Sequence, residues 1–269
     1  MDRLNILITG AASGIGQAVA SHFITQGHVV FGIDVADATL QENFHGFAAD
    51  ITDEASLQQV KNHLNQCGIQ LDAILNIAGI HAMASLVESD YARMKKIIDV
   101  NLSGTMLVNR VFHDCLAENG RIIIVTSEVA GFDPMPFNGL YNVTKTALDS
   151  YAQALRQELN LIGQKVVTIR PGAIETPLSR ESIKATQNLA DTTVLYKKQA
   201  KNFAGLASKF MGKPIKPEAL ASLIYKATTA THPKLVYKKH QNIGLVLLNI
   251  LPKGLQCAVI KFLLNLNLT

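Results

Sequence analysis

Short runs rich in isoleucine and valine alternate with longer segments of helical period along the chain as far as Arg170. The runs are almost continuously apolar, which is typical of strands covered on both faces. A strand followed by a helix, repeated, predicts an α/β fold with a doubly wound parallel sheet. The predicted strands are Asn5–Ile8, Val29–Ile33, Ala73–Asn76, Arg121–Thr126 and Val166–Arg170. The predicted helices are Gly16–Thr25, Ser56–Gln66, Tyr91–Leu116 and Tyr141–Leu161.

The pattern changes after Pro171, where residues 177–215 are polar and mixed. Ligand sites in doubly wound sheets gather outside the carboxyl ends of the strands, so an insertion there predicts a substrate lid. A solvated helical excursion without a role is the alternative. We expect one domain over residues 1–242, with the lid at about 177–215, followed by a C-terminal extension over residues 243–269.

Composition excludes several classes of protein. The net charge is +4, and we interpret the Lys and Arg residues as scattered along the sequence rather than clustered. Trp is absent, and aromatic residues make up only 6%. These features argue against a nucleic-acid partner. Cys67, Cys115 and Cys257 lie in no paired spacing, which argues against a disulfide framework or a metal site. We expect no signal peptide before the first strand, and the apolar run Ile243–Leu251 is shorter than the ~20 residues that span a bilayer. The expected location is the cytoplasm.

A glycine-rich turn follows the first predicted strand, in the string Thr9-Gly10-Ala11-Ala12-Ser13-Gly14-Ile15-Gly16. Glycines permit the tight turn and let the backbone approach a pyrophosphate. The next helix supplies unpaired N–H groups and a partial positive charge for that anion. Its place between a strand and a helix predicts a dinucleotide site.

The second predicted strand is followed by Asp34, about 20 residues past the loop. A carboxylate here accepts hydrogen bonds from both hydroxyls of the adenosine ribose and repels a 2′-phosphate. No Arg or Lys stands in the loop or just after Asp34. We therefore expect NAD rather than NADP; an aspartate that only caps the next turn is the alternative.

Tyr141 and Lys145 open the last predicted helix four residues apart, so their side chains share one face. A free tyrosine has a pKa near ~10, too high for a base at neutral pH. A nearby ammonium and a positive nicotinamide ring would lower that pKa. The phenol would then take a proton from an alcohol, or return one to a carbonyl. An exposed pair without a catalytic role is the alternative.

Together these features resemble the short-chain dehydrogenase/reductase family over residues 1 to about 230. The motifs in order are the glycine loop, Asp50-Ile51, Asn76-Ile77-Ala78-Gly79, Asn101, Ser127, Tyr141 with Lys145, and Pro171-Gly172 followed by Thr176. The resemblance implies a Rossmann-type sheet in three layers. It also implies NAD-linked transfer of hydride between a secondary alcohol and a ketone.

The resemblance implies a role for each matching residue. Those expected at the pyrophosphate are Gly10, Ser13, Gly14, Ile15 and Gly16. Those expected near the adenosine are Asp34, Asp50, Ile51, Asn76, Ala78 and Gly79. Those expected at the nicotinamide end are Tyr141, Lys145, Pro171, Gly172, Ile174 and Thr176. Lys145 would hold the nicotinamide ribose, and Asn101 would kink its helix and anchor a water in the proton relay.

The serine departs from the family pattern. Relatives carry a serine thirteen residues before the tyrosine, a register that here lands on Glu128, one residue past Ser127. Either a one-residue bulge restores Ser127 as the group that polarises the substrate oxygen, or Glu128 occupies the site. Neighbouring strand residues point to opposite sides, so both do not serve equally. We favour Ser127, because a carboxylate would oppose a developing oxyanion; a protonated or outward-turned Glu128 removes that objection.

The C-terminal extension repeats apolar residues at helical spacing, with lysines among them. The apolar residues are Leu255, Val259, Phe262, Leu263 and Leu266, and the lysines are Lys238, Lys239, Lys253 and Lys261. It resembles the tails of family members that act on steroids, retinoids or other lipophilic alcohols. One interpretation is an amphipathic surface that touches a membrane or covers a lipophilic pocket. The other is a helix packed on its own domain or on a partner subunit.

The expected partners are a small alcohol or ketone and further copies of the chain. The resemblance implies a homodimer or homotetramer formed through the helix that begins at Tyr141. Two other functions stay open on this fold. One is a cofactor-binding protein without turnover, and the other is a membrane-surface protein dominated by residues 243–269.

Overall fold

The computed structural model describes residues 3–37, 42–210 and 212–266. In these residues, seven parallel strands form one sheet of order β3-β2-β1-β4-β5-β6-β7. The strands are β1 (Asn5–Thr9), β2 (Val29–Asp34), β3 (Phe44–Ala48), β4 (Leu71–Asn76), β5 (Leu116–Val125), β6 (Lys165–Pro171) and β7 (Val236–Lys239). The strand order reverses direction between β1 and β4, and this confirms the doubly wound fold.

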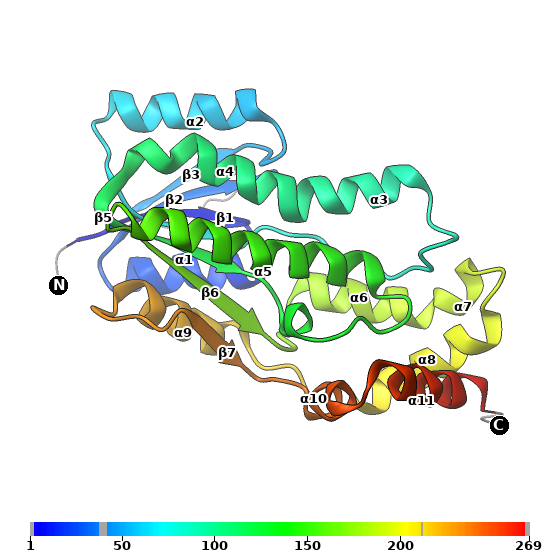
Figure 1. The fold of residues 1–269 in the computed structure, drawn as a ribbon. Helices are drawn as coiled ribbons and strands as arrows, with labels where there is room; N and C mark the ends of the chain where they lie inside the picture. The colour runs from blue at the N-terminus through cyan, green and yellow to red at the C-terminus, as the bar shows by residue number, and fades with distance from the viewer. Residues whose placement is uncertain (1–2, 38–41, 211, 267–269) are drawn as a thin grey trace.

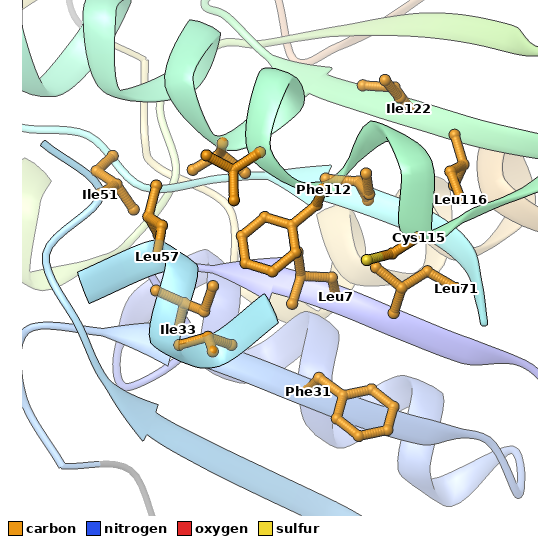
Figure 2. Close-up of a cluster of buried hydrophobic side chains, with 14 of the residues drawn as sticks. Leu7, Phe31, Ile33, Ile51, Leu57, Leu71, Phe112, Cys115, Leu116 and Ile122 are labelled. Carbon is orange, nitrogen blue, oxygen red and sulfur yellow. The ribbon is translucent and has the colours of Figure 1, made fainter. Parts of the chain in front are cut away.

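Helices cover both faces of the sheet and make three layers (Figure 1). On one face lie α2 (Glu54–Gln66), α4 (Thr105–Phe112) and α5 (Gly139–Asn160), and on the other α1 (Gly14–Thr25) and α9 (Pro217–Thr229). Figure 2 shows Phe112 of α4 among Leu7 of β1 and Leu57 of α2, and all three side chains are fully buried. Each face of the sheet therefore has its own apolar core, which explains the continuously apolar strands.

The two edge strands were not predicted, because neither carries a continuous apolar run. In β3 the five residues are partly or fully exposed, and β7 is a four-residue strand that ends in two lysines. The predicted helix Tyr91–Leu116 is also wrong in detail. It is divided into α3 (Tyr91–Ile98), a π-helical turn η1 (Asp99–Gly104), α4 and a 3₁₀ turn η2 (His113–Cys115), and Leu116 already belongs to β5.

The lid and the extension lie together beyond the carboxyl ends of the strands (Figure 1). The lid contains α6 (Pro177–Gln187), α7 (Leu189–Thr192) and α8 (Lys197–Phe210), and the extension contains α10 (Ile243–Ile250) and α11 (Lys253–Asn265). The amide of Asn202 in α8 donates to the carbonyl oxygens of Leu264, at 2.9 Å, and Leu266, at 2.8 Å. The inner face of α11 is thus packed on its own lid. Within the described part of the chain, every helix is too short or too polar to span a bilayer.

Candidate active site

The segments that follow β1, β2, β4, β5 and β6 meet at the carboxyl edge of the sheet. The Thr9 hydroxyl accepts hydrogen bonds from the N–H groups of Ile77, at 3.1 Å, and Ala78, at 3.2 Å, so it ties the loop after β4 to the loop after β1. The Gly10 N–H donates to the Ile33 carbonyl of β2 over 2.8 Å. The crevice at the reversal of strand order is therefore built from fixed backbone.

The glycine loop leaves no room for a side chain at Gly10 or at Gly16. Gly10 has a φ of 71°, and a Cβ there would lie 2.9 Å from the Cα of Ala78. A Cβ on Gly16 would overlap the carbonyl oxygen of Gly10. Ser13, at the N-terminus of α1, is exposed and makes no side-chain capping bond. Bare backbone at a helix N-terminus fits a pyrophosphate, so the residues present suit a dinucleotide.

The Asp34 carboxylate stands at the end of β2 beside this loop. Its Oδ2 accepts the N–H of Ala12 at 2.9 Å and its Oδ1 accepts the N–H of Ala36 at 3.1 Å. Each carboxylate oxygen has a second lone pair, so both remain able to accept a further hydrogen bond. The capping alternative is thus compatible with a ribose role.

The other residues expected near the adenosine differ in their environments. The Asp50 carboxylate accepts both the N–H and the hydroxyl of Thr52, at 2.8 Å each, while Ile51 is buried in the core against Gly104. Asn76 is buried and donates to the Asn109 side chain at 2.8 Å. Asp50 and Ile51 therefore already have partners within the fold.

The residues expected at the nicotinamide end follow β6 and reach the glycine loop. A Cβ on Gly14 would lie 3.3 Å from the Thr176 side chain, which caps α6 through the Ser179 N–H at 3.1 Å. Pro171 ends β6, and the Gly172 N–H donates a hydrogen bond to the Lys239 carbonyl at 2.8 Å. Ile174 is buried and forms an isolated parallel β-bridge with Ile215.

Tyr141, Lys145 and Asn101 come together beside the loop after β4. The Lys145 Nζ lies 5.8 Å from the centroid of the Tyr141 ring and donates to the Val125 carbonyl at 3.2 Å. Asn101 lies in the π-helical turn, which interrupts the helix where a kink was expected. Its side chain accepts a hydrogen bond from the Ile80 N–H at 2.7 Å and donates one to the Ile80 carbonyl at 2.9 Å. A Cβ on Gly79 would lie 3.2 Å from the Asn101 Oδ1 and 3.5 Å from the Lys145 Nζ, so Gly79 brings its backbone close to both side chains.

Burial dominates the electrostatics of the pair. It raises the pKa of Tyr141 to about 12, against a lowering by the Ser127 hydrogen bond, and the Glu128 charge raises that pKa further. Burial also lowers the pKa of Lys145 to about 8. The chain alone therefore does not produce the lowered phenol pKa that the sequence predicted. Desolvation of the phenolate outweighs an ammonium that is itself desolvated.

Ser127 and Glu128 point to different partners, although Glu128 does not continue the strand but opens a 3₁₀ turn over Glu128–Gly131, capped by the extended Ser127. Ser127 is close enough to the Tyr141 phenol to lower its pKa through a hydrogen bond. The Glu128 carboxylate instead accepts the N–H of Asn242 at 2.6 Å, at the start of α10. Burial raises the pKa of Glu128, while the Asn242 N–H and His240 lower it. The geometry therefore brings Ser127 to the phenol and turns Glu128 toward the C-terminal extension.

Sequence reasoning missed His81, whose ring packs on the Tyr141 ring with centroids 4.5 Å apart. Burial lowers the pKa of His81 to about 4, an interaction with the Asn138 side chain opposes this, and the Lys145 charge lowers it further. Neither Nδ1 of His81 nor Oδ1 of Asn138 makes a hydrogen bond of normal geometry, although both are buried. His81 is thus a neutral imidazole at the phenol. The one indication in the sequence was that His81 lies two residues after the Asn76–Gly79 motif, which was expected at the cofactor.

Comparisons with known proteins agree with this geometry. A model of the short chain dehydrogenase family matches residues 4–187. Serine 3-dehydrogenase of Rhizobium radiobacter is 32% identical over 200 residues, covering 71% of this chain and 80% of that protein. The NADPH-dependent 1-acyldihydroxyacetone phosphate reductase of Schizosaccharomyces pombe is 30% identical, covering 66% of this chain and 62% of that protein.

Among solved structures, a 3-ketoacyl-(acyl-carrier-protein) reductase from Brucella melitensis, complexed with NADH, has a TM-score of 0.70 and 26% identity, covering 87% of this chain and 96% of that chain. A short chain dehydrogenase family protein from Francisella tularensis shares the fold, with a TM-score of 0.75, 22% identity, and coverage of 88% of this chain and 97% of that chain. With its family model matched over more than half its length and its motifs gathered at one crevice, this chain belongs to the short-chain dehydrogenase family and is an oxidoreductase with a nicotinamide cofactor.

Proposed function

We propose that the protein transfers hydride between NAD(H) and a secondary alcohol or ketone. The observation that carries this proposal is the arrangement of Tyr141, with Ser127 hydrogen bonded to its phenol and the Lys145 ammonium at its ring. A nicotinamide held at this crevice would supply the acceptor or donor of the hydride exchanged with the substrate carbon. In oxidation Tyr141 takes the hydroxyl proton, and Ser127 donates a hydrogen bond to the same oxygen. Lys145 keeps a positive charge beside the phenol. Asn101 would anchor a water in the proton relay that begins there.

The assignment of residues to the cofactor rests on the crevice. Gly10, Ser13, Gly14, Ile15 and Gly16 would surround the pyrophosphate, since they form the tight turn between β1 and the N-terminus of α1 and Ser13 is exposed there. Ala78 lies against Gly10 and Thr176 lies against Gly14, so the loops after β4 and β6 both reach the glycine loop. We assign Asp34 to the adenosine ribose, so that NAD is preferred over NADP.

Replacing Asp34 with alanine is expected to weaken NAD binding about tenfold to a hundredfold, because hydrogen bonds to a charged acceptor are lost. The preference for NAD over NADP should fall at the same time, since the charge that repels a 2′-phosphate is gone. The measurement is kcat/KM for both cofactors with one alcohol. Asp34→Asn is the matched control, because its amide oxygen still accepts the Ala12 N–H. An unchanged cofactor ratio in both variants would show that Asp34 only supports the loop.

A lipophilic substrate is supported by the apolar side chains of the lid. An apolar cluster joins the loop after His81 to the lid, with Phe137 and Phe203 ring centroids 5.5 Å apart and Met83, Leu189, Ala200 and Leu264 packed around them. We propose that these side chains hold the apolar part of the substrate. The test is NADH formation from hydroxysteroids, hydroxyacyl thioesters, sugars and simple alcohols, with Tyr141→Phe as the blank. Turnover confined to sugars would contradict the lipophilic assignment, and no turnover with any class would favour a cofactor-binding protein without catalysis.

Glu128 is expected to hold the extension and to keep the phenol pKa high. Replacing it with glutamine keeps an acceptor for the Asn242 N–H and removes the charge that raises the Tyr141 pKa. The pH profile of alcohol oxidation should then shift to lower pH with little change in stability. Glu128→Ser also removes the acceptor, so it should cost about 1 to 2 kcal/mol of unfolding free energy as well. Urea denaturation and pH profiles of both variants test this, and equal stability of the two would contradict the role of the Asn242 contact.

We propose a homodimer or homotetramer formed through α5 and its neighbours. Exposed apolar side chains support this on three adjoining elements, namely Ile98 in α3, Met106 in α4 and Val143 in α5. Val143→Asp should convert the assembly to monomers, because a charge buried in an apolar interface is not compensated. Sedimentation velocity checks this, with Leu161→Asp as the control at an exposed site beyond the end of the same helix. A wild type that is monomeric at all concentrations would contradict the proposal.

We propose further that residues 243–269 make a peripheral membrane contact. The outward faces of α10 and α11 are apolar, which supports contact with lipid as well as packing on the lid.

A further inference from the structure

The charge of the chain is divided unevenly along its length. From Thr192 to Thr269 there are twelve lysines, no arginine and a single acid, Glu218, which gives a net charge of +11. Residues 1–191 hold 13 basic and 20 acidic residues, a net charge of −7, and the two parts add to the overall +4. The reading of the basic residues as scattered is therefore wrong. The small net charge conceals a cationic C-terminal segment, which lies beyond the residues that the family model matches.

Several lysines of the cationic segment lie on the lid, on the extension and at the end of β7. Lys197 and Lys201 are exposed on α8, which packs against α11, and Lys253 and Lys261 are exposed on α11 itself. The end of β7 adds Lys238, just before the loop in which the His240 Nε2 hydrogen bonds with the Lys213 carbonyl at 2.8 Å. Two acids contact this extension: Asp133, 3.5 Å from Lys253, and Glu128, which accepts the Asn242 N–H.

The outward face of α10 is apolar throughout. Ile243, Val246, Leu247 and Ile250 follow one stripe of the helix, with exposed fractions of 74%, 39%, 61% and 72%. The helix is held from its other side by polar contacts. Asn242 caps it through the Leu245 N–H at 3.2 Å, and the Asn249 side chain accepts the Asp133 N–H at 2.6 Å. An apolar stripe fixed outward by polar bonds needs a partner that is itself apolar.

The stripe continues in α11, which lies next to α10 (Figure 1). Its inward residues Gln256 and Leu264 are buried, whereas Leu255 and Phe262 on the opposite side are exposed by 51% and 65%. Lys261 stands beside Phe262 at the edge of the outward side. We call the exposed lysines 201, 238, 253 and 261, together with the outward residues of α10 and α11, the basic-apolar face.

We propose that the basic-apolar face docks on membranes that contain anionic lipids, with the apolar stripe inserted among the headgroups and the lysines against their charges. This inference deepens the proposed function, because the face includes Lys201 of the lid, whose apolar cluster is assigned to the substrate. A lipophilic substrate would then enter from the bilayer. A second copy of the chain fits less well, since two faces of the same strong positive charge repel each other. Nucleic acid fits less well because it offers nothing to the apolar stripe.

The test is co-sedimentation of the full chain with phosphatidylcholine vesicles, with and without phosphatidylserine. Binding to the anionic vesicles should be at least about tenfold stronger and should fall as salt is added. The triple variant Lys201→Glu, Lys238→Glu, Lys261→Glu should lose about a hundredfold or more, because each basic residue near an anionic surface changes partitioning roughly fivefold. Leu247→Ser with Phe262→Ser should lose binding by removing the insertion. Lys96→Glu and Leu161→Ser, at exposed sites on α3 and beyond α5, are the matched controls and should bind as the wild type does.

Oxidation of a water-soluble alcohol with NAD should be unchanged in all these variants, which shows that they fold. Lipid binding without any alcohol turnover would contradict the proposed reaction and leave this inference standing. Equal binding to both kinds of vesicle, or to neither, would overturn it. Self-association in the absence of lipid that Leu247→Ser abolishes would also overturn it, by making the face an interface between copies. Salt-sensitive binding to a DNA duplex in place of vesicles would do the same.

Discussion

Tyr141→Phe is expected to lower turnover by about a hundredfold to ten-thousandfold while NAD affinity stays nearly unchanged. The substitution removes one oxygen and keeps the ring, so the packing against His81 and the contact with Lys145 are preserved. What is lost is the group that takes the proton from the alcohol. Because burial holds the pKa of this phenol at about 12 in the chain alone, the wild-type rate of alcohol oxidation should rise with pH through the neutral range.

The measurement combines steady-state turnover with a titration of NADH fluorescence. Ser127→Ala is the matched comparison, since it removes the hydrogen bond that lowers the phenol pKa and leaves the phenol in place. Its turnover should fall less, and its pH profile should move to higher pH. Loss of NADH binding in Tyr141→Phe would contradict the assignment of this residue to proton transfer. Retention of turnover would contradict the whole site.

The parts of the fold that the sequence predicted are those in which burial leaves a local pattern. The five central strands are covered on both faces, so each reads as an apolar run. The edge strand β3 is partly exposed, and its order of polar and apolar residues carries no such pattern. The kink at Asn101 was expected only from the family resemblance, since the bonds between the Asn101 side chain and the Ile80 backbone join residues 21 apart and leave no local pattern.

The candidate site divides in the same way. Residues with a fixed spacing, such as Gly10, Gly14, Tyr141 and Lys145, were identified because the spacing itself carries the chemistry. His81 was missed because its contact with Tyr141 depends on how two distant loops meet. Glu128 could be identified as a departure, yet only the position of Asn242 shows what the carboxylate binds. The electrostatic balance at the phenol was also misjudged, since sequence spacing shows the neighbouring charge and hides the desolvation that opposes it.

Lys145→Met should raise the stability of the protein while it abolishes most of the turnover. The Lys145 side chain is buried with a single hydrogen bond, to the Val125 carbonyl, and burial lowers its pKa to about 8 from the ordinary 10.5. A depression of this size corresponds to a cost of about 3 kcal/mol for folding with the charged lysine. Methionine has a similar shape without the charge, but leaves the Val125 carbonyl without its donor, which costs about 1 kcal/mol. The variant should therefore be about 2 kcal/mol more stable near pH 7.

The sign of the pH dependence distinguishes this cause from better packing. Between pH 8 and 10.5 the unfolded wild type holds a proton on Lys145 that the folded protein has released. Wild-type stability gains a favourable contribution as pH rises through that window, and the advantage of methionine shrinks accordingly. Urea denaturation of both proteins without cofactor, at pH 7 and near pH 10, measures the two differences, since a bound ligand would add its own stabilisation. A difference that does not change with pH would assign the gain to packing. Turnover should fall by about a hundredfold or more, because no cation remains beside the phenol. If the unliganded protein is stabilised in this way, the buried lysine is retained at the expense of stability because the reaction requires its charge.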